Sequence, residues 1–437
     1  MRRTIVSQET SPRAEARRFD THLSLSVIAL CLVILNLAIL FSQSEPIRAG
    51  KTDFKFFYIG ALVLRSNSGT ELYDYDLHAR IESQMFPSAP YLSVNNHPPF
   101  ELLLFLPFTG LSYLHAFYLW LAITAGLAIA SGRLLAGKLE QLSAFWRLMP
   151  YALVVCLFPF LSVLLNGQDS AVALSLLVAC WLSLRRGRDA RAGFFLGLGL
   201  FKFQIVLPLV VLLACWKPKI LRGFGLSAAI LVIISAIMVH PAGLITYFQY
   251  LTRMAHESST SVRLNYGMDP RWMPNLRGLA YGIASRGANS LPPSFAFLFV
   301  VALACTSALT FVWAIRELRA VRSRSNETTD LVFAFAVIVS LLLSFHLLPH
   351  DLTLLAVPFA LVLNRMVAPG ARRGPRQFAL AGLVASFYLT PLFLLLIQHL
   401  LVYLFGAVVL ACAALVSVEL SELGLSQASG RATLQAD

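Results

Sequence analysis

Long apolar runs without charges recur along the whole chain, and short segments between them carry most of the polar residues. The runs at 23–41 and 113–132 are each about 20 residues long, the length that a helix needs to cross the hydrocarbon core of a bilayer. The pattern predicts an all-α polytopic membrane protein with about 12 transmembrane helices. We expect them near 23–41, 113–132, 148–165, 171–184, 193–201, 203–216, 223–239, 291–314, 331–345, 352–364, 378–396 and 400–418.

The composition excludes a soluble globular protein. Hydrophobic residues make up 57% of the chain and charged residues 13%, whereas a soluble domain carries roughly 25% charged residues. The net charge of +13 would suggest a nucleic-acid partner in a soluble chain, but here the basic residues cluster between apolar runs. We therefore interpret them as topology signals and expect no nucleic-acid partner. The six cysteines all lie in apolar runs without CxxC spacing, so we expect neither disulfides nor a metal site.

Basic residues are dense in every second short loop, which predicts that these loops and the N-terminus are cytoplasmic. Residues 1–22 then form a cytoplasmic tail before an uncleaved anchor helix, 23–418 one transmembrane domain, and 419–437 a cytoplasmic tail that looks disordered from Ser421. Two long loops, at about 42–112 and 240–290, are predicted to be external. The basic clusters are Arg133, Lys138 and Arg147; Arg185, Arg186, Arg188 and Arg191; Lys217, Lys219 and Arg222; Arg316, Arg319, Arg322 and Arg324; and Arg365, Arg372, Arg373 and Arg376.

This orientation allows only one crossing between the first external loop and Arg133. The segment 98–111 is short, begins with Pro98 and Pro99, and contains Glu101. We therefore assign it to a juxtamembrane helix on the outer surface and keep 113–132 as the crossing.

Several predicted helices are too short to span the membrane alone. A helix of 9 to 15 residues rises only about 14 to 22 Å, against a hydrocarbon core of about 30 Å. Backbone that ends at such a depth is tolerated only where protein buries it or where it lines a wet cavity. The predicted outer ends carry polar residues, which points to a site there: 166–169 with Gln168 and Asp169, Lys202 with Gln204, and His346 with His350 and Asp351.

Lys202 needs an anionic partner, because a charge at membrane depth costs about 2.5–3.5 kcal/mol. The partner is either Asp169 or Asp351, in a structural ion pair, or an anionic ligand such as a lipid phosphate. Asp169 itself could instead cap the helix that begins at Ala171.

His346 and His350 would share one face of a continuous helix, but Pro349 argues against such a helix. Metal binding, structural hydrogen bonding and contact with a phosphate or sugar are the alternatives. Asp53 is either a solvated loop acid balanced by Lys51 and Lys55, or a carboxylate at the lipid interface that can accept a proton from a hydroxyl group.

Six short motifs follow one another along the chain: Asp53-Phe54 to Tyr58, Leu72-Tyr73-Asp74, His97-Pro98-Pro99, Gly167-Gln168, Gly197-Leu198 to Lys202, and Ser344 to Pro358 with His350-Asp351. Their order resembles glycosyltransferase family 87, multi-spanning enzymes of the GT-C superfamily. The resemblance covers most of the chain, from Asp53 to about Pro358.

The resemblance implies a GT-C-type fold and transfer of a sugar, typically mannose, from a polyprenyl-phosphate donor to a lipid or glycan acceptor. Transfer would occur with inversion, on the external face of a bacterial inner membrane, and would need no cofactor. Asp53 would be the general base. Lys202 and His350 would contact the donor phosphate, with Gln168, Asp169 and His346 lining the same cavity, so that Asp53 lies across the cavity from Lys202.

Two other functions remain as alternatives. Secondary transporters also carry broken helices and charges at membrane depth, but they usually contain paired repeats, and the polar interruptions here are not symmetrically placed. A polymerase or ligase that moves a whole lipid-linked glycan would use a similar donor.

Overall fold

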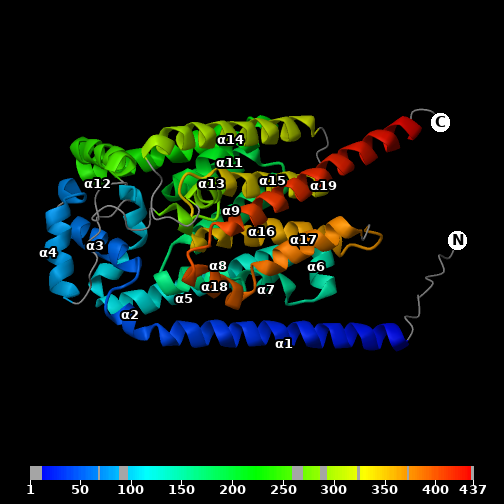
Figure 1. Cartoon of the computed structure of the whole chain (residues 1–437), viewed down its shortest axis with the longest axis horizontal. Coiled ribbons are helices and arrows are strands. Elements are labelled where there is room, and N and C mark those ends of the chain that lie inside the picture. The colour runs from blue at the N-terminus through cyan, green and yellow to red at the C-terminus, as the bar shows by residue number, and fades with distance from the viewer. Residues whose placement is uncertain are drawn as a thin grey trace.

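Every regular element that the structure describes is a helix. The structure is a computed structural model, and the residues it describes are 12–66, 69–87, 97–257, 269–285, 293–321, 325–371 and 374–434. Most of the long helices run roughly along one axis (Figure 1), with both chain ends at one end of the molecule and helices α2 (Ser44–Arg48), α3 (Phe54–Arg65) and α4 (Tyr75–Met85) at the other.

Six described helices are long and apolar enough to cross a membrane. Three further pairs of apolar helices pass the same test together but bend by 50° to 68° at a short break, which gives up to nine spans. The six are α1 (Pro12–Ser42), α5 (Tyr113–Ala136), α12 (Ile220–Glu257), α14 (Pro293–Ala320), α15 (Asn326–Leu343) and α19 (Leu404–Leu434). The pairs are α7 (Met149–Val155) with α8 (Phe158–Asn166), α10 (Asp189–Leu198) with α11 (Phe203–Trp216), and α17 (Pro375–Ser386) with α18 (Thr390–Gln398).

The predicted number of about 12 crossings is therefore too high for the described helices. The apolar runs at 193–201 and 203–216 are the two arms of one bent pair. The runs at 171–184 and 352–364 correspond to α9 (Ser170–Arg185) and α16 (Ala356–Met366), which rise only about 24 and 17 Å. The predicted apolar runs are helical, but several of them are too short to count as separate membrane spans.

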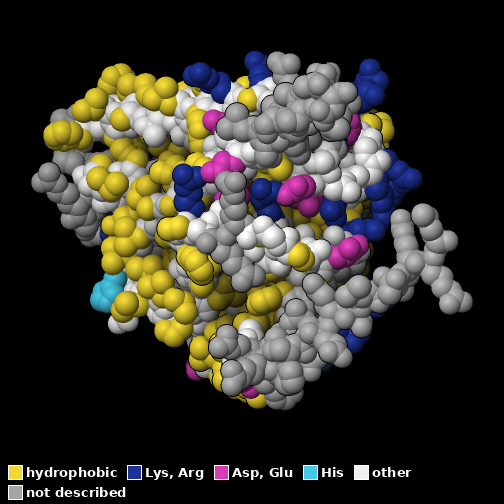
Figure 2. Space-filling view, turned by 90° about the vertical axis from the view of Figure 1, so that its right-hand side faces the viewer, with side chains coloured by type: hydrophobic (Ala, Val, Ile, Leu, Met, Phe, Trp, Pro, Cys, Tyr) yellow, Lys and Arg dark blue, Asp and Glu magenta, His cyan; other side chains and the backbone are white. Residues whose placement is uncertain are grey.

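The basic loops are gathered at one end of the molecule, as the contacts between them indicate. Lys217 at the end of α11 pairs with Asp189 at the start of α10 at 3.1 Å, so this pair returns to the end it came from. Arg185 donates to the carbonyl oxygen of Lys138 at 3.0 Å. Figure 2 views this end, where Lys, Arg, Asp and Glu side chains cluster. Arg322, Arg324, Arg372 and Arg373 lie outside the described residues.

The C-terminal segment corrects one expectation. Helix α19 continues to Leu434, so the tail that we expected to be disordered from Ser421 is helical through that residue. Near the start of this segment, Arg376 contacts Glu422 at 2.6 Å and Arg365 contacts Glu419 at 3.4 Å.

The first predicted external loop folds as a helical unit around a buried aromatic cluster. After α4, two short 3₁₀ helices, η2 (Pro99–Leu104) and η3 (Leu106–Gly110), lead into α5. The Phe57 and Phe105 rings stack with centroids 4.4 Å apart, and Phe54 meets Phe117 edge to face at 5.5 Å. As predicted, the segment 98–111 is not a spanning helix. It packs inward, however, and the side chain of Glu101 is buried.

The second predicted loop is also largely helical where it is described. Helix α12 continues past residue 240, with a kink at His240, whose φ of 58° is non-helical, followed by Pro241. A 3₁₀ turn, η5 (Pro270–Trp272), and helix α13 (Leu276–Ser285) come before α14.

Candidate active site

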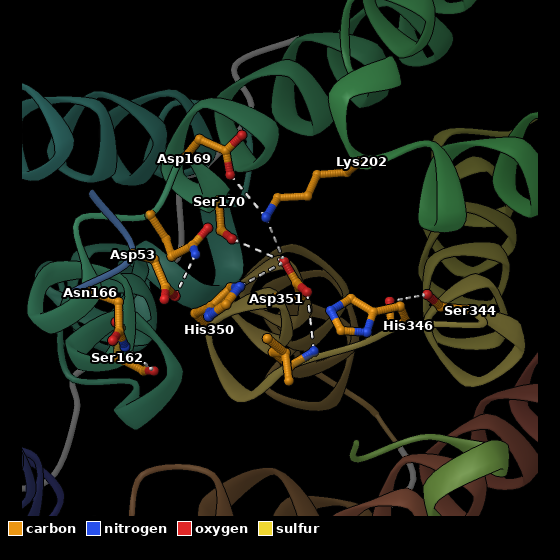
Figure 3. Close-up of polar contacts among 12 residues, drawn as sticks. Asp53, Ser162, Asn166, Asp169, Ser170, Lys202, Ser344, His346, His350 and Asp351 are labelled. Atoms are coloured by element: carbon orange, nitrogen blue, oxygen red, sulfur yellow. Dashed lines mark hydrogen bonds and ion pairs between the residues drawn. The ribbon is translucent and has the colours of Figure 1, made fainter. Parts of the chain in front are cut away.

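Polar side chains from three distant parts of the chain meet at the ends of α8, α10 and α15, away from the basic end (Figure 3). Helix α8 ends at Asn166 and is followed by Gly167, whose φ of 64° is the left-handed conformation that glycine adopts without strain. A Cβ atom at this position would lie 2.7 Å from the Cβ of Phe54. The close approach at Gly167 brings the loop that carries Gln168 and Asp169 against the start of α3.

Asp53 contacts this loop directly. The amide of Gln168 donates a hydrogen bond of 2.7 Å to Oδ2 of Asp53, and Figure 3 shows the two side chains facing each other. Asp53 is half-buried at the N-terminus of α3 and forms no side-chain cap there. The first predicted loop and the broken helices therefore share one polar site.

Lys202 lies at the tip of the α10–α11 pair, on the short 3₁₀ turn η4 (Leu200–Lys202), and forms two ion pairs. Its Nζ lies 2.9 Å from Oδ1 of Asp169 and 3.0 Å from Oδ1 of Asp351. All three side chains are almost fully buried. Of the two alternatives for Lys202, the structure shows the structural ion pair, and it involves both acids rather than one.

Asp169 uses its carboxylate for this ion pair and not for capping. It occupies the N-cap position of α9, but its side chain accepts no hydrogen bond from the first turn of that helix. The Asp169 carboxylate therefore does not satisfy the free backbone N–H groups in the first turn of α9.

Asp351 is the most connected acid of the site. Ser170 Oγ donates to its Oδ1 at 3.1 Å, and the backbone amide of Leu348 donates to its Oδ2 at 3.1 Å. The ring of His350 lies 3.6 Å from the same Oδ1. Asp351, which the sequence indicated both as a possible partner of Lys202 and as part of the His350-Asp351 motif, thus connects α9, η4 and the loop after α15.

Pro349 begins a 3₁₀ helix, η6 (Pro349–Leu355), and α15 already ends at Leu343. His346 and His350 are therefore not on one continuous helix, as Pro349 indicated. Both rings nevertheless lie next to Asp351 (Figure 3). Among the described residues, no group of three or more His, Cys, Asp or Glu side chains has the geometry to hold a metal ion.

Lys55 corrects the interpretation of Asp53 as an acid balanced by neighbouring lysines. The Lys55 ammonium is buried and pairs with Glu82 on α4 at 2.5 Å. Its charge stabilises the contact between α3 and α4. The ion-pair partner that the structure gives Lys55 is therefore Glu82.

Two residues near the site were not predicted as site residues. Nδ1 of His97 lies 2.9 Å from Oε2 of Glu101, whose side chain is fully buried. Burial and the nearby Asp169 raise the pKa of Glu101 well above its ordinary value, while burial lowers the pKa of His97 to about 4. The spacing of four residues was visible in the sequence, but the burial of Glu101 was not.

The assembled site is a buried acidic cluster with imidazole and amide donors around it. The structure brings together Asp53, Gln168, Asp169, Lys202, His350 and His346, the six residues that the sequence singled out. Such a site offers a half-buried carboxylate to accept a proton and several N–H groups to bind an anion or sugar hydroxyls.

Comparison with known proteins gives one match. The sequence profile of Glycosyltransferase family 87 matches residues 96–344, more than half of the chain. Neither the curated proteins nor the solved structures contain a match.

Proposed function

This chain belongs to glycosyltransferase family 87, and from that membership we propose that it transfers a sugar, most simply mannose, from a polyprenyl phosphate to a hydroxyl group of a lipid or glycan acceptor. The fold is of the GT-C type in this proposal. The site faces the outside of a bacterial inner membrane, with the N-terminus in the cytoplasm.

One observation carries the proposal: the hydrogen bond of 2.7 Å between Gln168 and Asp53. It joins the acid of the first loop to the buried cluster of Lys202, Asp169, Asp351 and His350. Sugar transfer from a phosphate requires a base and N–H donors for the phosphate, and Asp53 supplies the first while Lys202 and His350 carry N–H groups of the second kind.

Asp53 is the general base in this mechanism. The acceptor oxygen attacks C1 of the sugar as its proton passes to the Asp53 carboxylate, and the bond between C1 and the phosphate oxygen breaks. The electron pair of that bond leaves with polyprenyl phosphate. Attack opposite to the leaving group inverts the configuration at C1, so the base and the phosphate lie on opposite sides of the sugar. In Figure 3 the His350 ring lies between Asp53 and Asp351, the acid with which Lys202 pairs, which is compatible with this arrangement.

His350 and His346 line the donor side in this proposal, and Gln168 lines the same cavity next to Asp53. Each carries an N–H group that can donate to a phosphate or sugar oxygen. Lys202 has three N–H groups, and the two ion pairs to Asp169 and Asp351 leave one for the donor. Holding these two acids in place is then its first role.

A donor panel tests the function. The purified protein in liposomes is incubated with labelled polyprenyl-phosphate mannose, polyprenyl-phosphate glucose, GDP-mannose, or a glycan on polyprenyl diphosphate, with extracted cell-envelope lipids as acceptors. We expect labelled product from a polyprenyl-phosphate monosaccharide and none from the nucleotide sugar.

Two results would contradict the proposal. Product from the diphosphate-linked glycan alone would identify a polymerase or ligase. Accumulation of an unmodified labelled lipid or sugar inside the liposomes, without any new glycosidic product, would identify a transporter.

A further inference from the structure

The charges at the proposed donor site do not favour an anion. Lys202 is shared between two carboxylates, at 2.9 and 3.0 Å, so these three side chains together carry a negative charge. Asp53 adds another carboxylate nearby. A departing polyprenyl phosphate gains negative charge, and a site that stabilises it needs a cation that is not already neutralised.

Arg277, on the first turn of α13, is such a cation. Its Nη1 donates to the backbone oxygen of Phe345 at 3.2 Å, and its guanidinium lies 4.1 Å from the centre of the Phe345 ring. The side chain is half-buried. Within the described part of the chain, it forms no ion pair with an acid.

Arg271, six residues earlier, shows how a neighbouring acid affects the pKa of a guanidinium. Arg271 is held by Asp269 in an ion pair of 2.7 Å, and this hydrogen bond raises the pKa of its guanidinium. Burial instead lowers the pKa of Arg277, and no acid offsets the effect. Arg277 is thus partly desolvated without a neutralising partner, an arrangement that an anionic ligand would stabilise.

Asn275 fixes Arg277 to the loop that carries the site histidines. Its buried amide donates to the backbone oxygen of Ser344 at 2.6 Å, while its Oδ1 accepts from the amide of Gly278 and caps α13. Ser344 Oγ donates in turn to the backbone oxygen of His346 at 2.7 Å. Arg277 lies within electrostatic reach of His346, which lies within reach of His350 and Asp351.

We propose that Arg277 is a phosphate-binding residue of the donor site, whose guanidinium binds the phosphate of the polyprenyl-linked sugar beside His346. A guanidinium stays charged throughout and presents a planar pair of N–H groups that matches two phosphate oxygens. Its contact strengthens as the leaving phosphate gains charge. This inference rests on the proposed function.

The test compares Arg277→Met with wild type in liposomes, at saturating acceptor and varied polyprenyl-phosphate mannose. Methionine keeps an unbranched stem against Phe345 and removes the charge. We expect the KM for the donor, and the inhibition constant of the product polyprenyl phosphate, to rise at least about tenfold, with the KM for the acceptor unchanged. Arg80→Met, on the exposed face of α4, is the matched control and should behave as wild type.

Donor KM and product inhibition that stay at wild-type values in Arg277→Met would overturn the inference. If that variant does not elute as a monodisperse protein, Arg277→Lys carries the test, because it keeps the charge but loses the planar fork. Several-fold weaker product inhibition supports the inference, and wild-type inhibition overturns it. Failure of wild type to use any polyprenyl-phosphate sugar would instead contradict the proposed function itself.

Discussion

Lys202 is the residue on which the buried charge balance of the site depends. In Lys202→Met, Asp169 and Asp351 would remain buried without their shared cation. Removing one partner of a buried ion pair typically costs about 3–5 kcal/mol. We therefore expect a clearly lower thermal unfolding temperature for the purified variant in detergent.

Lys219→Met is the control, because Lys219 is exposed at the basic end, and it should leave the unfolding temperature unchanged. An unchanged unfolding temperature in Lys202→Met, together with weaker donor binding, would contradict the structural role. It would assign Lys202 to the phosphate alone.

Glu101 predicts a pH dependence. Its pKa is raised above the ordinary value of 4.5, so the folded protein holds the proton more tightly than the unfolded chain. The stability that this proton confers is fully present below about pH 4.5 and is lost as the pH rises through the raised pKa. Glutamine is neutral at every pH. Glu101→Gln should therefore unfold at a higher temperature than wild type at pH 9, and the difference should shrink towards pH 5.

Unfolding of both proteins is followed from pH 5 to 9, with the exposed Glu71→Gln as the control. A difference that is constant with pH, or larger at pH 5, would show that Glu101 does not hold its proton in the folded protein.

At the scale of elements, the α8–α9 turn sets the distance between the broken helices and the first loop. Gly167→Ala would force a left-handed conformation on an alanine, which costs roughly 1–2 kcal/mol, and would bring its Cβ into Phe54 beside Asp53. We expect a lower unfolding temperature and weaker sugar transfer.

Gly126 provides the matched control for this substitution. It lies inside α5, and a Cβ there meets nothing within 4 Å. Gly126→Ala should keep transfer at the wild-type level and leave stability equal or slightly higher, because alanine favours a helix. Equal loss of activity in both variants would show that the turn has no special role.

Elements that depend on local chemistry could be predicted from the sequence. Pro349 indicated the break between His346 and His350, because proline ends a helix. The polar tips of the short helices indicated a site, because charges at membrane depth need a function or a partner. The return of the α10–α11 pair was indicated by the basic clusters that precede and follow it, and the contact between Asp189 and Lys217 agrees with this.

Contacts between residues that are far apart in the sequence could not be predicted, because they depend on how the helices pack. The sequence placed Glu101 on a juxtamembrane helix at the outer surface, whereas the fold buries its side chain. Arg277 belonged to no motif. It stands out only in the fold, because no acid among the described residues forms an ion pair with it. Asp53, by contrast, was selected from the resemblance of the first loop to the family, in a segment that precedes the matched residues 96–344.

For the whole molecule, the gathering of the basic loops at one end predicts a defined orientation. A cysteine at Asp76, exposed on α4, should react with a membrane-impermeant maleimide in intact cells. A cysteine at Lys219, exposed at the basic end, should react only after the membrane is opened. The parent chain, whose native cysteines lie in apolar segments, is the control. The opposite labelling pattern would invert the topology and put the site in the cytoplasm.

The central claim is that Asp53 removes the proton from the acceptor hydroxyl during sugar transfer. The direct measurement is transfer from radiolabelled polyprenyl-phosphate mannose to endogenous lipid acceptors in membranes, comparing wild type, Asp53→Asn and the exposed-acid control Asp76→Asn at matched abundance. Asparagine can still accept the hydrogen bond from Gln168, so the variant keeps the local geometry and loses the base. The account predicts a loss of about 10²- to 10⁴-fold in Asp53→Asn and wild-type transfer in Asp76→Asn. Equal transfer by wild type and Asp53→Asn would contradict it.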